Sequence, residues 1–474
     1  MKNLRKTAFL LPFFLLINLY ESNSLQILGQ EEISIQRLIE KNSLDFEDIP
    51  NLVIDNNLEL KALKELINSS SLNLASKISE KYPRLDLNAN GLPQYLYGRN
   101  YNSSSIDTKS SQLKLNPSLN IRWDIIDPQK GTNIKLAKNQ FEIAKNNLEI
   151  KKNDLQQEAQ LRFHKFQKAS EETKNAITNV QLSRQSLSDA KSKLEAGIGT
   201  KFDVLEASAQ LARDNQFLEE KKIAKEINII SLKEILNINL EDDLKINERQ
   251  KLIGFWNYSL GDNIQNGLNK SLSLKNISLQ NSIKNNQARS YINAKKPSIY
   301  ISNNLSSSFS KGSTLSQNID ADESSSSYTN TISLNFAWNI FDGGVNNNSY
   351  KSKLAEANAE QYKYFNLKNI IQVNISETYL NLKKNQQKLL STDQEIIASN
   401  ESLRLARLRY DAGISTLKDV LIRQKELSDA KLKKITAIYN YNINLDKLEK
   451  LTFQNKYKNC IDDNKNQINS FCYY

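Results

Sequence analysis

The sequence predicts a mixed α and β membrane protein built from two copies of one unit, with long α-helical hairpins and four β-strands per chain. Three observations predict this fold class. The chain begins with an apolar segment typical of export, several motifs recur at offsets of 214 to 216 residues, and stretches of period-two hydrophobicity alternate with long stretches free of Pro and Gly. With only 39% hydrophobic residues and a mean hydropathy of −0.57, one thick globular core is not expected.

The N-terminus is interpreted as a signal peptide at residues 1–24. Basic residues precede the apolar run TAFLLPFFLLINLY, and SNS at 22–24 offers the small residues that a signal peptidase accepts. We expect the mature chain to begin near Leu25. A single membrane-anchoring helix is the alternative, for which the run is rather short. No later stretch reaches about 18 consecutive apolar residues, so any membrane insertion is expected to use strands.

An internal duplication explains the recurring motifs. LEAGIGT recurs 216 residues later as YDAGIST, and WDIID recurs as WNIFD, which aligns Trp123 with Trp338. KYPRLDL is answered by KKPSIYI, which aligns Pro83 with Pro297. The predicted division is a first repeat at 25–240, a linker at 241–259, a second repeat at 260–452 and a C-terminal tail at 453–474.

Each repeat contains one expected β-hairpin, at 84–126 and at 297–341. In LKLNPSLNIRWDI, which starts at Leu113, apolar residues and one proline alternate with polar residues, as in a strand with one apolar and one wet face. The Ser- and Asn-rich segments 98–111 and 310–327 are expected as exposed loops. This leaves four strands of about ten residues each.

Strands of that length cross a bilayer in a tilted barrel, but four strands cannot close one, because known barrels have at least about eight. Several chains are therefore expected to share a barrel. A soluble hairpin with one face packed on a core is the alternative.

The remaining sequence predicts two helical hairpins, at 133–236 and 349–451. The long helices before each turn contain neither Pro nor Gly, and Gly197 and Gly413 are expected to end them. In the last helix, an apolar heptad pattern is interrupted by Arg423, Lys434 and Asn444. A thin and partly wet seam of this kind favours helices arranged side by side around an aqueous space.

Composition argues against several other functions. The net charge is +11, but the lysines are scattered and form no basic face interleaved with aromatics, so no nucleic-acid partner is expected. His164 is the only histidine, which leaves a catalytic triad or a metal site without nitrogen ligands, and it is expected to be a surface or helix-packing residue. No enzyme activity, cofactor or metal is expected. Cys460 and Cys472 could form one local disulfide or remain free thiols.

The sequence resembles the TolC family of outer-membrane efflux proteins, over about residues 31–452. RYDAGISTLKDVL at 409–421 is similar to the family signature Tyr-x-x-Gly-x-x-Ser/Thr-x-x-Asp-Val-Leu, and FDGG at 341–344 leaves a strand into a helix. The resemblance implies a homotrimer whose four strands per chain form a twelve-stranded barrel in the outer membrane, surrounded by lipid and continued by a helical barrel in the periplasm.

The implied function is the exit duct of a tripartite efflux or type I secretion system, with a periplasmic adaptor (membrane fusion) protein and an inner-membrane transporter as partners. A periplasmic coiled-coil scaffold of the cell envelope is the alternative, which needs the long helices but not the alternating hairpins. The sequence does not distinguish a small-molecule substrate from a protein substrate.

The resemblance also implies roles for residues near the two turns. Asp419, Asp203 and Tyr410 match residues of a periplasmic gate, and a ring of three Asp419 carboxylates would favour cations. Helix N-capping is the compatible alternative for both aspartates. Ser415 and Ile422 stand where the family pattern has an arginine and a second acid, so locking by an arginine bridge is not expected. The residues expected to dock an adaptor lie in the two turns: Gly197, Thr200, Gly413 and Thr416.

Overall fold

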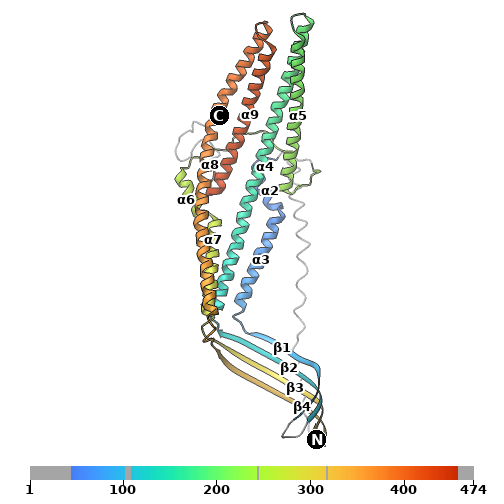
Figure 1. Cartoon of the computed structure of the whole chain (residues 1–474), viewed down its shortest axis with the longest axis vertical. Helices are drawn as coiled ribbons and strands as arrows, with labels where there is room; N and C mark the ends of the chain where they lie inside the picture. The colour runs from blue at the N-terminus through green and yellow to red at the C-terminus, as the bar shows by residue number, and fades with distance from the viewer. Residues whose placement is uncertain (1–43, 102–107, 243–244, 317–318, 457–474) are drawn as a thin grey trace. The chain divides into compact units, whose positions relative to one another are not determined.

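The computed structural model describes residues 44–101, 108–242, 245–316 and 319–456 (Figure 1). The predicted signal peptide and both cysteines lie outside the described residues. The helices are α2 (Ile49–Asn56), α3 (Leu58–Ser79), α4 (Lys130–Glu195), α5 (Lys201–Leu236), α6 (Leu260–Lys270), α7 (Leu272–Asn293), α8 (Val345–Asp411) and α9 (Leu417–Thr452). The strands are β1 (Arg84–Asn100), β2 (Thr108–Ile126), β3 (Ser298–Ser316) and β4 (Ile319–Ala337).

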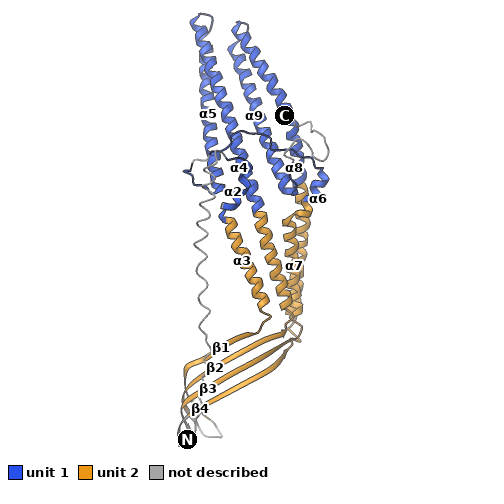
Figure 2. Cartoon of the chain, turned by 180° about the vertical axis from the view of Figure 1, so that it is seen from behind, with its two compact units in different colours: residues 1–58, 152–266, 374–474 blue, residues 59–151, 267–373 orange. Residues whose placement is uncertain are grey.

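The chain divides into two compact units, coloured separately in Figure 2. Unit 1 consists of Met1–Leu58, Lys152–Asn266 and Asn374–Tyr474, and unit 2 consists of Glu59–Lys151 and Gly267–Val373. Unit 2 contains the strands, and unit 1 contains the two helical turns that follow α4 and α8.

A four-stranded antiparallel sheet in the order β1-β2-β3-β4 dominates unit 2 (Figure 1). Its apolar residues alternate as predicted and lie exposed on one face, with Leu87 at 77% and Leu334 at 71% exposure. The other face carries hydrogen-bonded Ser and Asn side chains, such as Ser302 with Ser333 at 2.8 Å between their hydroxyl oxygens. The sheet therefore has one apolar and one wet face, and both reach solvent in a single chain.

The strands are 17 to 19 residues long, so the prediction of about ten was wrong. The described parts of the segments expected as loops are almost entirely strand, since β1 continues to Asn100, β2 starts at Thr108, β3 continues to Ser316 and β4 starts at Ile319. Ladder hydrogen bonds join backbone groups, which Ser, Thr and Asn supply as well as apolar residues do. Apolar alternation marks only the part of a strand that has an apolar face.

The four long helices are confirmed to within a few residues of their predicted ends. No described helix is long and apolar enough to cross a membrane.

In unit 2, α7 contacts the first parts of α4 and α8 through polar pairs such as Asn146 with Asn276 at 2.8 Å. Lys284 and Lys353 both bind Glu356, and their hydrogen bonds lower the pKa of Glu356 to about 2.

The core of unit 1 lies between α4 and α9. Phe163, Phe166 and Tyr441 are among its largest buried side chains. The segment 245–254 crosses these helices, where the Tyr441 hydroxyl donates to the Gly254 carbonyl at 3.1 Å. Burial of apolar side chains and hydrogen bonds to backbone carbonyls of the crossing segment together hold α4 and α9 in place.

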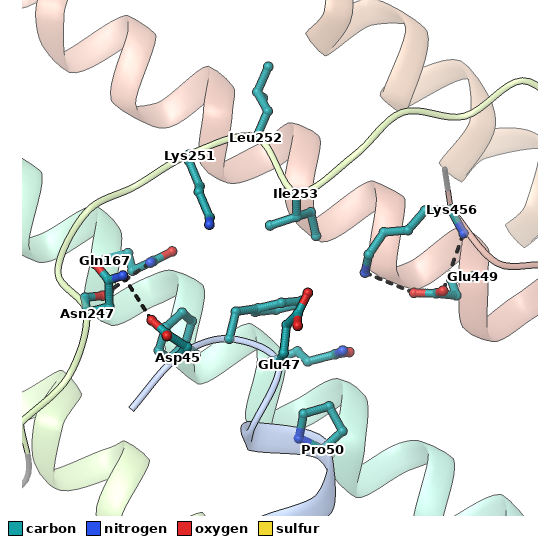
Figure 3. A pocket seen from close by; sticks show the side chains of 13 residues that line it. Asp45, Glu47, Pro50, Gln167, Asn247, Lys251, Leu252, Ile253, Glu449 and Lys456 are labelled. Carbon is teal, nitrogen blue, oxygen red and sulfur yellow. Dashed lines mark hydrogen bonds and ion pairs between the residues drawn. The ribbon is translucent and has the colours of Figure 1, made fainter. Parts of the chain in front are cut away.

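His164 belongs to this core, so of the two expectations the helix-packing one is confirmed. It is 1% exposed, its ring lies 4.9 Å from that of Phe46, and its Nε2 lies 2.9 Å from Asp446. Lys456 pairs with Asp446 at 2.8 Å and with Glu449 at 3.0 Å. A pocket of about 610 Å³ lies beside this cluster, and Figure 3 shows carboxylate and lysine side chains around it.

Between α4 and α9, unit 1 also has a buried polar seam. Gln424 donates to the Ser183 hydroxyl at 2.9 Å, and the amide of Asn175 lies 3.0 Å from the Ser428 hydroxyl. Asn179 donates to the same Ser428 hydroxyl at 2.6 Å. These five residues, which we call the amide seam, replace apolar contacts at the positions where two long helices from different repeats meet.

Two equivalent tryptophans tie the sheet of unit 2 to helix ends. The Trp123 indole donates to the Lys81 carbonyl at 3.0 Å, just beyond α3, and the Trp338 indole donates to the Lys295 carbonyl at 2.8 Å, just beyond α7. The duplication therefore preserves one hydrogen bond at the same place in both repeats.

Replacing either tryptophan with phenylalanine removes this donor while keeping an apolar ring. We expect Trp123→Phe and Trp338→Phe each to lower the free energy of unfolding by about 0.5–1.5 kcal/mol. The two losses should add, because the sites share no partner. Chemical denaturation in detergent, followed by far-UV circular dichroism, measures this, with Tyr328→Phe, at an exposed position of β4, as the control. Unchanged unfolding in the double variant would contradict the assignment.

Candidate gate and docking turns

The two turns that end α4 and α8 share one backbone geometry. Gly197 has φ 74° and Gly413 has φ 75°, a left-handed conformation that costs glycine little. In the first turn the Ile198 amide donates to the Lys193 carbonyl at 3.0 Å, and in the second the Ile414 amide donates to the Arg409 carbonyl at 3.0 Å. The repeated glycine thus ends each long helix in the same way.

A threonine begins the next helix in each turn. The Thr200 hydroxyl accepts from the Asp203 amide at 3.1 Å, and the Asp203 carboxylate accepts from the Thr200 amide, which closes a capping box. The Thr416 hydroxyl accepts from the Asp419 amide at 3.3 Å. Both aspartates therefore lie in the first turn of a helix, where a negative charge is favourable.

Asp419 differs from Asp203 in its second contact. The Ser415 hydroxyl donates to the Asp419 carboxylate at 2.7 Å. This hydrogen bond, with contributions from Thr416 and the charge of Arg409, lowers the pKa of Asp419 below its ordinary value of 3.8. The serine that stands in place of the family's arginine thus contacts the predicted gate carboxylate directly.

Tyr410 lies where the two helical hairpins meet. It packs on a cluster of Ala190, Ala207 and Leu417, which come from both hairpins, and on a second cluster within α8 and α9. Burial raises the pKa of Tyr410, and the negative charge of Asp203 raises it further. The hydrogen bonds found for Asp203 and for Asp419 stay within their own turns, so among the described residues no hydrogen bond joins either aspartate to Tyr410.

Sequence reasoning missed two features of the turns. Ile198 and Ile414, each directly after the turn glycine, are 78% and 69% exposed. The repeated Gly-Ile pair was a visible signal for them. Lys193 contacts the second hairpin, with its ammonium nitrogen 2.7 Å from the Tyr410 carbonyl oxygen. A lysine at a helix end normally indicates a solvated residue, so no sequence signal identified this contact.

The described residues contain no cluster of His, Cys, Asp and Glu side chains arranged to hold a metal ion. The chemistry that the turns offer is electrostatic and steric. They combine carboxylates at helix starts, one aromatic ring between hairpins and exposed apolar side chains at the outermost residues.

Comparison with known proteins identifies the family. Residues 49–237 and 264–452 each match the family model described as outer membrane efflux protein. No curated protein matches the sequence. The solved outer-membrane channel OprN is similar with a TM-score of 0.72 and 15% identity, covering 86% of this chain and 89% of that chain.

Two further solved structures have the same fold. The outer membrane protein VceC from Vibrio cholerae has a TM-score of 0.71 and 13% identity, covering 86% of this chain and 96% of that chain. The CmeC outer membrane channel of Campylobacter jejuni has a TM-score of 0.70 and 16% identity, covering 86% of this chain and 85% of that chain. Because the two family matches together span well over half of the sequence, this chain belongs to the outer membrane efflux protein family.

Proposed function

We propose that this outer-membrane efflux channel works as a homotrimeric, non-enzymatic exit duct, supplied by an inner-membrane transporter through a periplasmic adaptor protein. The open-edged sheet carries the proposal. It has four strands with an exposed apolar face, and three copies supply twelve strands, enough to close a membrane barrel. The apolar face then meets outer-membrane lipid, and the Ser- and Asn-rich face lines the duct.

Export of the chain itself would use the signal peptide at 1–24. The channel belongs to an efflux family, and both tripartite efflux and type I secretion would need the same duct. The family match favours a conduit over the alternative of a periplasmic scaffold, for which an exposed apolar sheet would be a liability.

The two turns are proposed as the docking surface for the adaptor. Gly197, Thr200, Gly413 and Thr416 give both turns the same backbone, and each turn presents one exposed isoleucine. A trimer then offers the same small apolar surface six times. Repeated copies of one adaptor hairpin could bind such a surface in a ring.

Asp419, Asp203 and Tyr410 are proposed as the periplasmic gate. Asp419 is exposed and, like any aspartate whose pKa is not raised, carries a negative charge at neutral pH, so three copies around one axis would form a negative ring. Asp203 acts beside Tyr410, whose ring fixes the junction of the two hairpins. Capping and gating are compatible, because a capping carboxylate still carries its charge.

Replacing Asp419 with alanine tests the channel and the gate together. We expect discrete current steps for the wild-type protein in a planar bilayer, and weaker cation preference for Asp419→Ala because the negative ring is lost. Asp429→Ala, which removes an exposed carboxylate further along α9, is the charge-matched control. If the current steps and their cation preference are the same in the Asp419 variant, the protein is a channel but Asp419 only caps its helix. If neither protein gives current steps, the proposal of a duct is wrong.

The pH dependence of this cation preference should report the Ser415 contact. A lowered pKa keeps Asp419 charged to lower pH, so wild-type selectivity is present above that pKa and disappears as the pH falls through it. Ser415→Ala removes the stabilising donor, and its selectivity should disappear at a higher pH than that of the wild type. Reversal potentials in a salt gradient, titrated from about pH 7 to about pH 3, measure the midpoint. Ser192→Ala serves as control, and coincident midpoints would exclude the contact.

The docking surface is tested by shortening its two isoleucines. We expect Ile198→Ala and Ile414→Ala each to raise the Kd for a purified periplasmic adaptor about tenfold, since a central apolar anchor typically contributes more than about 1 kcal/mol. Surface plasmon resonance on the detergent-purified trimer measures this. Ile227→Ala, which is 60% exposed on α5 and outside the turns, should bind as the wild type does. Equal affinity for all variants would move the docking surface elsewhere.

A further inference from the structure

We infer that Lys193 locks the gate in this protein, by fastening the end of the first helical hairpin to Tyr410 of the second within one protomer. This inference rests on the proposed gate, but it assigns the lock to a residue outside the predicted set. It concerns only contacts inside unit 1, where both helix ends lie.

Three contacts of one ammonium group carry the inference. The Lys193 nitrogen donates to the Tyr410 carbonyl at 2.7 Å and lies 3.6 Å from the centre of the Tyr410 ring. It also lies 3.5 Å from the Asp411 carboxylate. A surface lysine rarely has a carbonyl, a ring face and a carboxylate as simultaneous partners, and the Lys193 side chain is only 19% exposed.

The chain places Lys193 rigidly. The first turn uses the Lys193 carbonyl as acceptor for the amides of Ile198 and Gly199, at 3.0 Å and 2.9 Å. On the other side, Tyr410 is fixed by apolar clusters from both hairpins. Both ends of the contact are therefore held by packing and backbone hydrogen bonds, which reduces the entropy lost when the contact forms.

The contact forms at only one of the two helix ends that the duplication makes equivalent. At the repeat offset of 216, Lys193 corresponds to Arg409, but Tyr410 corresponds to Leu194. An aliphatic side chain offers no ring face to a cation, so the first repeat cannot build the reciprocal contact. The duplication thus supplies a cation at both helix ends and an aromatic acceptor at only one.

This lysine can take the role that Ser415 cannot. Ser415 binds Asp419 within the second turn and so joins nothing to the other hairpin. Lys193 joins residues 217 positions apart, from α4 to α8. The Asp411 carboxylate is 64% exposed and so contributes weakly, which leaves the carbonyl and the ring as the main partners.

Replacing Lys193 with methionine tests the lock, because methionine keeps much of the length and loses the charge. We expect Lys193→Met to raise the ratio of open to closed time in single-channel recordings about tenfold, as for loss of one charge-assisted hydrogen bond. Lys191→Met, with an exposed side chain two residues earlier, is the charge-matched control and should match the wild type. Lys193→Arg should keep the channel closed, because a guanidinium also binds a carbonyl and a ring face.

Variants of Tyr410 distinguish the contribution of its ring from that of its carbonyl in the contact with Lys193. Tyr410→Phe keeps both partners and should resemble the wild type, whereas Tyr410→Leu should open the channel more often. A combined Lys193→Met and Tyr410→Leu variant should open little more than Lys193→Met alone, because both remove one shared contact. Additive effects, or an equal rise for Lys191→Met, would overturn the lock.

A second measurement keeps the lock testable if no current is seen. Hydrogen exchange on the full-length protein in detergent should be faster in the last turns of α4 and α8 for Lys193→Met than for Lys191→Met. Faster exchange without channels would reject the proposed function and retain the contact. Channels with unchanged exchange and unchanged open time would retain the function and reject the lock.

Discussion

The unpaired edges of the sheet constrain everything else in this protein. With the order β1-β2-β3-β4, the outer sides of β1 and β4 leave rows of backbone donors and acceptors, and the described sheet has no further strand to pair them. In lipid each unpaired group costs several kcal/mol, so the edges must meet another chain. The exposed apolar face adds a different requirement, because its side chains are stabilised by an apolar surrounding such as lipid and not by water. The proposed association of several chains would pair both of these edges at once.

Sequence patterns predicted the parts of the fold that repeat or alternate. The glycine turns, the long helices and the apolar strand faces were visible because each depends on local residue type and period. Strand length was not predictable, since the outer halves of β3 and β4 consist largely of Ser and charged residues, with one Thr and one Gly, which form a ladder without an apolar signature. The segment 245–254 was expected as a linker, yet it supplies carbonyl acceptors to Tyr441 and Asn442. Contacts of this kind depend on tertiary placement, which no sequence period encodes.

In the candidate site, too, features that depend on a local motif were predictable and contacts between distant residues were not. The duplicated motif located both turns and marks Asp203 and Asp419 twice, whereas Tyr410 was named through the family resemblance alone, because Leu194 stands at its place in the first repeat. The sequence did not predict the contact of Lys193 with Tyr410. This contact joins the two hairpins and has no counterpart at the equivalent positions Arg409 and Leu194. The contacts give the differences at Tyr410 and Ser415 a physical meaning, because Tyr410 is the only aromatic residue in the two described apolar clusters beside the turns, and Ser415 binds Asp419.

The amide seam has a consequence for how the two hairpins part. Apolar side chains that separate expose surface to water at a cost proportional to area, with nothing to replace the lost contact. Each hydrogen bond between Gln424 or Ser428 and its partners on α4 can instead be exchanged for one to water, and the amide oxygens of Asn175 and Gln424 already have no partner among the described residues. Hairpins joined in this way can separate in small steps while water hydrates the amide seam, so α4 and α9 can move apart without unfolding first.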